Sequence, residues 1–295
     1  MRTPPHNVPA SAIHGNVREG AGTKGFSMKK TFITIICIAL FHPSNPVCAF
    51  DLDLSKEEKV TALNAGALLV AAAWGIIFWD YGQKGMRMED EKWFQKDSAE
   101  GGADKLGHFY SNYIMTHGFA CIYESWDYKP RRAALYGALS SFGVMGFVEL
   151  GDSFSENGFS YSDLIMNTLG SGAGYLLYSS PELARKIDFR IEYKPDFGEG
   201  DIFTDYEGMK FLMAVKLDGF DFITNEYLKY PEFHLGYYAR GYSEDTGDKS
   251  RNLYVGIGIN MSKILRDFSW EKTARAFNYV QLPFTYISAR HNFNE

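Results

Sequence analysis

Ionisable and amide side chains interrupt an otherwise apolar helical stretch over residues 104–174. They fall in three segments, DKLGHF at 104–109, ELGD at 149–152 and GFSYSDLIMNTLGSGAG at 158–174. An ionisable side chain among residues that favour burial destabilises a fold by several kcal/mol unless it is paired. We therefore expect the three segments to pack together, so that their polar groups satisfy one another inside the protein.

The spacing within these segments places the polar groups on shared helix faces. Asp104 and His108 are four residues apart, and Asn112 extends the same face by four more. Asp163 and Asn167 repeat the spacing on a second helix, and two glycines continue that face. Glycine lets a second helix approach closely, so this pattern predicts tight helix packing beside the polar groups.

Several of these residues have a simpler structural explanation. Asp104 could serve as the N-cap of its helix. Ser160 and Asp163 fit a capping box in which Asp replaces the usual Glu. Asn167 could form a hydrogen bond to a neighbouring backbone. These alternatives stay open beside the interpretation as a shared site.

Glu149 has no such explanation. It follows the uncharged run 133–148 and lies at the end of a helix, where it has no N-terminus to cap. A buried carboxylate needs a partner. We expect that partner to be His108 or Lys105.

Two interpretations of the polar segments remain. In the first, they form a buried network that fixes helix register, or a pocket for a lipid headgroup or glycan, and no cofactor is needed. Its binding residues would be Asp104, Lys105, His108, Glu149, Asp152, Ser160, Asp163 and Asn167. In the second, a hydrolase or transferase acts on envelope lipid or glycan with a divalent metal. Its metal ligands would be His108, Asp104 and Asp152, with Glu149 and His108 as catalytic groups.

The N-terminus has the features of a secretory signal peptide. A charged start, MKK at 28–30, precedes the short apolar run 31–41 and small residues at 47–49. We therefore assign residues 1–49 to an upstream extension followed by a cleaved signal. This predicts export to the periplasm or cell envelope.

The remaining chain has helical patterns first and strand patterns afterwards. Helices are expected at about 55–79, 104–124, 130–148 and 160–179. From residue 186 the hydrophobic period changes to two, and strands are expected at about 187–193, 209–217, 233–239, 253–259 and 279–287. This order predicts an α+β fold: a bundle of about four apolar helices over 50–182, then an antiparallel β-rich domain over 183–295.

The charge distribution limits the partners of the exported chain. Residues 1–49 carry five Lys/Arg and one acid, so the remainder has 25 basic and 35 acidic residues, a net charge of −10. An acidic body argues against nucleic acid. If the helices crossed a membrane, the basic loops would lie on the side opposite to the usual rule. We therefore expect a periplasmic bundle with one face on a membrane surface, with a membrane-spanning bundle as the alternative.

Together, the three motifs resemble the YfiM-like family of predicted periplasmic lipoproteins and, more distantly, VanZ-like membrane proteins. The resemblance covers about 104–175 and implies no established activity. It carries over to Asp104, Lys105, His108, Phe109, Glu149, Asp152, Gly158, Phe159, Ser160, Asp163, Leu164, Asn167 and Gly170. Two features depart from it: Cys48 lacks the context of a lipidation site, and the short members lack a β-rich tail. That tail suggests a sheet that covers the bundle or touches the outer membrane.

Overall fold

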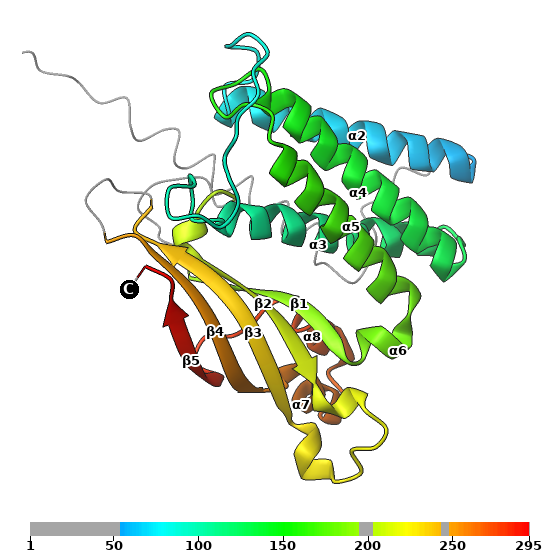
Figure 1. Ribbon diagram of the computed structural model, residues 1–295. Helices are drawn as coiled ribbons and strands as arrows, with labels where there is room; N and C mark the ends of the chain where they lie inside the picture. The colour runs from blue at the N-terminus through cyan, green and yellow to red at the C-terminus, as the bar shows by residue number, and fades with distance from the viewer. Residues whose placement is uncertain (1–53, 195–202, 243–247, 295) are drawn as a thin grey trace, which may run out of the picture. The chain divides into compact units, whose positions relative to one another are not determined.

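The computed structural model describes residues 54–194, 203–242 and 248–294 (Figure 1). The predicted signal peptide lies outside these residues. The long helices come first in the chain and the strands follow, which confirms the predicted α+β order; two short helices, α7 (Met261–Asp267) and α8 (Glu271–Ala276), precede the last strand. The boundary between the long helices and the strands is the short helix α6 (Pro181–Ala184).

Four long helices form the first part of the described chain. They are α2 (Lys56–Phe78), α3 (Ala103–Ser125), α4 (Pro130–Asp152) and α5 (Tyr161–Ser179). The capping box expected at the start of α2 is present, because Ser55 and Glu58 each accept a hydrogen bond from the other's backbone N–H. Ser160 caps α5 by accepting from the backbone of Asp163. Gly102, not Asp104, is the N-cap of α3.

Helix α3 is the central element, because it packs against both α4 and α5 and also against the sheet. The glycine face of α5 allows this close packing. A side-chain carbon at Gly170 would collide with the backbone carbonyl of Phe109, and one at Gly174 would collide with Thr116. The close approach predicted from the glycine pattern is therefore present.

The strands form one antiparallel sheet in the order β1-β2-β3-β4-β5. Their bounds are β1 (Ile187–Tyr193), β2 (Met209–Lys216), β3 (Pro231–Arg240), β4 (Ser250–Ile259) and β5 (Tyr286–Asn292). The last strand begins later than the predicted 279–287. Pro283 lacks an N–H for the ladder, and Phe284 has a positive φ of 64°, so the chain turns there. Residues 279–281 instead bond to Ile191 of β1.

One face of the sheet is mainly apolar and the other is mainly polar. Both differ from the usual pattern, in which apolar side chains are buried and polar side chains are exposed. On one face, Phe189 and Ile191 of β1 join the core formed with Tyr110 and Tyr113 of α3. Farther along this apolar face, large side chains of β3, β4 and β5 stay exposed: Phe233, Leu235, Leu253, Val255, Ile257, Ile259 and Ile287. The opposite face is polar and buried. Beside the buried Leu212, Ala214 and Tyr254, its buried polar members are Asp188, Arg190, Glu192, Lys216, Glu232, His234 and Asn252.

The segment before β5 also fastens the sheet to the bundle through His117 of α3. The hydroxyl of Tyr279 lies 2.8 Å from His117 Nδ1, and His117 Nε2 lies 3.1 Å from the carbonyl oxygen of Gly174. A neutral ring satisfies both contacts, with Nε2–H donating to the carbonyl and Nδ1 accepting from the tyrosine. Burial lowers the pKa of His117 from 6.5 to about 4.

This lowered pKa predicts an acid-dependent loss of stability. In the unfolded chain His117 becomes protonated below about pH 6.5. In the folded chain it becomes protonated only near pH 4. The neutral His117 makes its full contribution to the free energy of unfolding above pH 6.5. That free energy falls by about 3 kcal/mol as the pH drops to 4. Urea denaturation of wild type and His117→Gln at several pH values measures the difference. Equal slopes of stability against pH in the two proteins would contradict the assignment.

Candidate functional site

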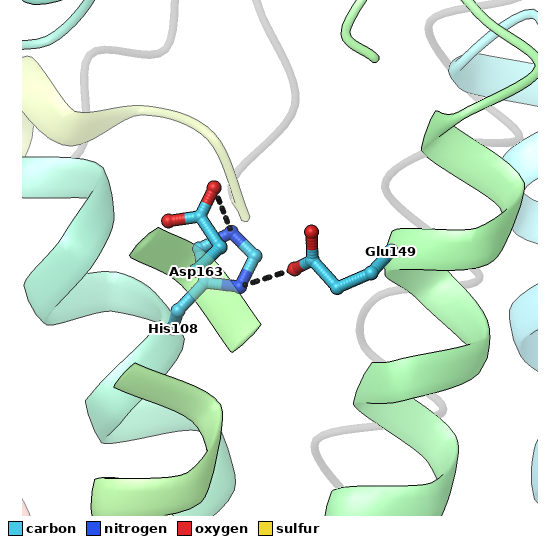
Figure 2. A group of neighbouring side chains, drawn as sticks. All are labelled: His108, Glu149 and Asp163. Carbon is cyan, nitrogen blue, oxygen red and sulfur yellow. Dashed lines mark ion pairs between the residues drawn. The ribbon is translucent and has the colours of Figure 1, made fainter. Parts of the chain in front are cut away.

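The imidazole of His108 lies between two carboxylates from other helices (Figure 2). His108 Nδ1 is 3.2 Å from Glu149 Oε1 on α4, and His108 Nε2 is 3.9 Å from Asp163 Oδ2 on α5. The side chains of Glu149 and Asp163 are 2% and 5% exposed, whereas that of His108 is 16% exposed. The predicted convergence of three helices is therefore present. We call the group defined by these residues and their direct partners the polar centre.

Lys105 is the ammonium cation of the polar centre. Its side chain is fully buried, and its Nζ lies 2.8 Å from both Asp104 Oδ2 and Asp163 Oδ1. It also pairs with Glu91, which comes from the loop between α2 and α3. Burial opposes the charge, but Asp104 and Asp163 hold the pKa of Lys105 above its ordinary value. Lys105 thus joins three carboxylates from separate parts of the chain.

Two amides connect the histidine to Glu149. Asn167 donates from Nδ2 to Glu149 Oε1 at 3.1 Å. Its Oδ1 accepts from Asn112 Nδ2 at 2.6 Å and lies 3.2 Å from His108 Nδ1. Asn112 is itself held by its second contact, to the carbonyl of His108 at 3.1 Å. Asn167 is therefore part of the centre and is not confined to a backbone contact.

Two predicted residues lie at the edge of this arrangement. Asp152 accepts from Asn157 Nδ2 at 3.1 Å. Ser160 accepts from the backbone N–H of Asp163 at 3.3 Å, so its observed contact is that of a helix cap. Of the predicted binding residues, the direct contacts join Asp104, Lys105, His108, Glu149, Asp163 and Asn167.

Burial dominates the proton affinities of most carboxyls in the centre. It raises the pKa of Glu149 to about 8, that of Glu91 to about 7 and that of Asp152 to about 6. Burial also acts on Asp163, but His108 and Lys105 outweigh it and hold that pKa below its ordinary value. Burial likewise disfavours a charged His108, yet Asp163 and Glu149 raise its pKa. Burial thus favours the neutral form of Glu149, whereas His108 and Lys105 favour the ionised form of Asp163.

The centre contains two groups whose donor atoms are close enough to share a cation. One is His108, Glu149 and Asp163, and the other is Glu91, Asp104 and Asp163. Neither is the predicted ligand set of His108, Asp104 and Asp152. Asp104 lies on the Lys105 side and Asp152 contacts Asn157. The sequence pattern did not single out Glu91, which lies in a loop without periodicity.

Comparison with known proteins identifies one matching family model. Residues 90–179 match the family described as "Predicted periplasmic lipoprotein (DUF2279)". This range contains the polar centre and ends with α5, so the similarity covers the bundle without α2 and without the sheet. No curated protein and no solved structure matches the chain. The family description supports a location in the periplasm or cell envelope, associated with a membrane.

Proposed function

We propose that the protein is a non-catalytic, membrane-associated structural component of the cell envelope. In this role α2 contacts lipid, and the polar centre holds α3, α4 and α5 in register. The family similarity supports the envelope location. Within that description, the motifs favour a place near the YfiM-like proteins, with the VanZ-like proteins more distant.

The exposure of α2 carries the membrane part of this proposal. Within the part of the chain that the structure describes, two helices are long and apolar enough to cross a bilayer, Lys56–Phe78 and Pro130–Asp152. Only 11% of the most apolar window of α2 is buried, compared with 44% for α4. Leu69, Ile76 and Ile77 are 71%, 65% and 67% exposed. Burial inside the protein therefore does not account for this apolar helix, whereas contact with acyl chains would.

The contacts of the polar centre support the register role. Each of α3, α4 and α5 contributes a side chain that is at least nine-tenths buried and paired across helices: Lys105, Glu149 and Asp163. Sliding one helix by a turn would move its charge away from these partners and leave it unpaired in the interior. A single polar residue can specify register in helical assemblies in this way.

Flotation with neutral phosphatidylcholine vesicles tests the membrane contact. The exported chain should float with the vesicles, and Leu69→Glu combined with Ile76→Glu should remain in the dense fraction, because two charges would enter the acyl region. Lys272→Gln combined with Lys263→Gln is the control, since it makes the same change in net charge at other positions. Flotation of the glutamate variant at the wild-type level would overturn the proposal.

Carbonate extraction of cell membranes separates surface contact from membrane spanning. A protein that rests on the membrane should be released by alkaline carbonate, whereas a spanning bundle should stay in the pellet. A third result, recovery in the soluble fraction before carbonate is added, would contradict membrane association altogether.

A further inference from the structure

We propose that the polar centre binds one divalent transition-metal cation of the Zn²⁺ type through His108, Glu149 and Asp163. This inference goes beyond the structural role and does not depend on lipid contact. It also differs from the ligand set predicted from the sequence, since Glu149 and Asp163 replace Asp104 and Asp152.

The donor atoms of the three residues lie close enough to be drawn onto one cation, although their spacing is wider than in a formed zinc site. One donor atom from each of the three residues lies within 4.8 Å of the other two. Zinc bonds of about 2.0–2.1 Å in tetrahedral geometry place neighbouring ligand atoms roughly 3.3 Å apart. Glu149 contacts one ring nitrogen of His108 at 3.2 Å and Asp163 contacts the other at 3.9 Å. A rotation of the Glu149 or the Asp163 carboxylate would bring both carboxylates to the same ring nitrogen of His108, where one cation could bind all three residues.

The proposed ligands are already oriented by other side chains. Lys105 pairs with Oδ1 of Asp163, while Oδ2 of the same carboxylate faces His108. Asn167 holds Glu149 and is in turn held by Asn112. Partners of this kind fix ligand orientation in metal sites. Because three helices supply the ligands, the site would exist only in the folded bundle.

The charge of the centre also favours a cation. Metal binding requires a neutral His108 and an ionised Glu149, so any proton that makes the ring cationic or the carboxyl neutral is released. Lys105 is then the cation of the centre beside the carboxylates of Glu91, Asp104, Glu149, Asp152 and Asp163. Asp104 Oδ1 is buried without a hydrogen-bond partner among the described residues. A divalent ion would neutralise part of this surplus. The second group of donors, around Glu91 and Asp104, already surrounds the ammonium of Lys105.

The mixture of donors selects the class of metal. An imidazole nitrogen with carboxylate oxygens suits zinc and neighbouring transition metals, whereas calcium and magnesium prefer all-oxygen sites. Three protein ligands leave a coordination position for water. The proposal concerns binding alone, and no reaction is assigned to that water.

Zinc titration of the exported chain tests the site, with affinity tags removed and after dialysis against a chelator. Calorimetry should give one saturable site per chain, and the melting temperature should rise with zinc. His108→Gln and Glu149→Gln should each weaken binding by at least about 10–100-fold, the loss that removal of a ligand's outer partner alone causes. His117→Gln is the matched control, because it removes a histidine of the same helix that contacts Tyr279 and Gly174 instead.

A spectroscopic measurement on the wild type avoids any dependence on variant folding. Cobalt(II) added in place of zinc should give absorption bands typical of nitrogen and oxygen ligation, and one equivalent of zinc should remove them. The absence of saturable binding in the wild type would overturn the proposal. So would undiminished binding in both folded variants. Vesicle flotation in the presence of a chelator measures membrane contact without bound metal. The membrane proposal and the metal proposal can therefore be refuted separately.

Discussion

Replacing Lys105 with methionine should lower the free energy of unfolding by about 3–5 kcal/mol. Methionine preserves much of the apolar stem, so the change removes mainly the ammonium group. Three carboxylates, Asp104, Asp163 and Glu91, would then face one another in the interior without their shared cation. Urea denaturation followed by tryptophan fluorescence measures this loss. It should be among the largest effects of any single substitution in the bundle.

Lys84→Met provides the control for this measurement. Lys84 is 47% exposed and pairs with Glu156 at 2.6 Å. Exposed pairs of this kind contribute about 0–1 kcal/mol. A loss in Lys105→Met no larger than in the control would show that the buried pairs do not stabilise the bundle.

A double variant tests whether the penalty comes from unpaired charge. Asp104→Asn keeps the shape of the side chain and removes one of the carboxylates left behind by Lys105→Met. Combined with Lys105→Met, it should recover a part of the lost stability, which appears as a favourable coupling in a double-mutant cycle. Strict additivity of the two changes would assign the loss to packing instead.

The helices were predictable because their signals are local. Long uncharged runs, the capping box at Ser55 and the cap at Ser160 are all visible along the chain, and each is present in the structure. The last strand was placed too early because the alternation in 279–287 continues across Pro283. A turn that does not interrupt the alternation of hydrophobic residues cannot be detected from that alternation.

The polar centre was predictable only in part, for a related reason. Helical spacing placed His108, Asp163 and Asn167 on inward faces, and their contacts follow from those faces. Glu91 has no periodic context, and only the folded loop brings it to Lys105. Pairing between separate helices depends on their relative rotation, which spacing within one helix does not determine. This explains why the metal ligands predicted from the sequence differ from the three residues whose donor atoms lie close together, His108, Glu149 and Asp163.

The sheet shows a further limit of sequence patterns. An alternating strand predicts two faces of different polarity, but it does not state which face is buried. Here the charged face is buried, while Val255 and Ile257 of the apolar face are 57% and 50% exposed. The buried position of Arg190 therefore could not be inferred from alternation alone.

Arg190 joins β1 to β3 on the buried polar face of the sheet. It forms two hydrogen bonds to Glu232 of β3, at 2.6 and 2.9 Å, and one to Asp188 of its own strand at 2.9 Å. Lys216 of β2 contacts the other oxygen of Asp188 at 2.8 Å. Two cations thus face two carboxylates, and with the ring of His234, which lies 2.8 Å from Glu232 Oε1, taken as neutral the charges of this group balance, unlike those of the polar centre. A balanced network has no need of an added ion and is explained by its role in holding the strands together.

Arg190→Met should therefore lower the free energy of unfolding by about 3–5 kcal/mol, because Glu232 would remain buried with only part of its partners. Arg185→Met is the control: Arg185 lies just before β1, is 39% exposed, and pairs with Glu182 and Asp221. That exposed arginine should contribute about 0–1 kcal/mol. Adding Glu232→Gln to Arg190→Met should restore part of the loss, since it removes the stranded charge. Equal losses in the two arginine variants, measured by urea denaturation, would show that the buried network does not stabilise the sheet.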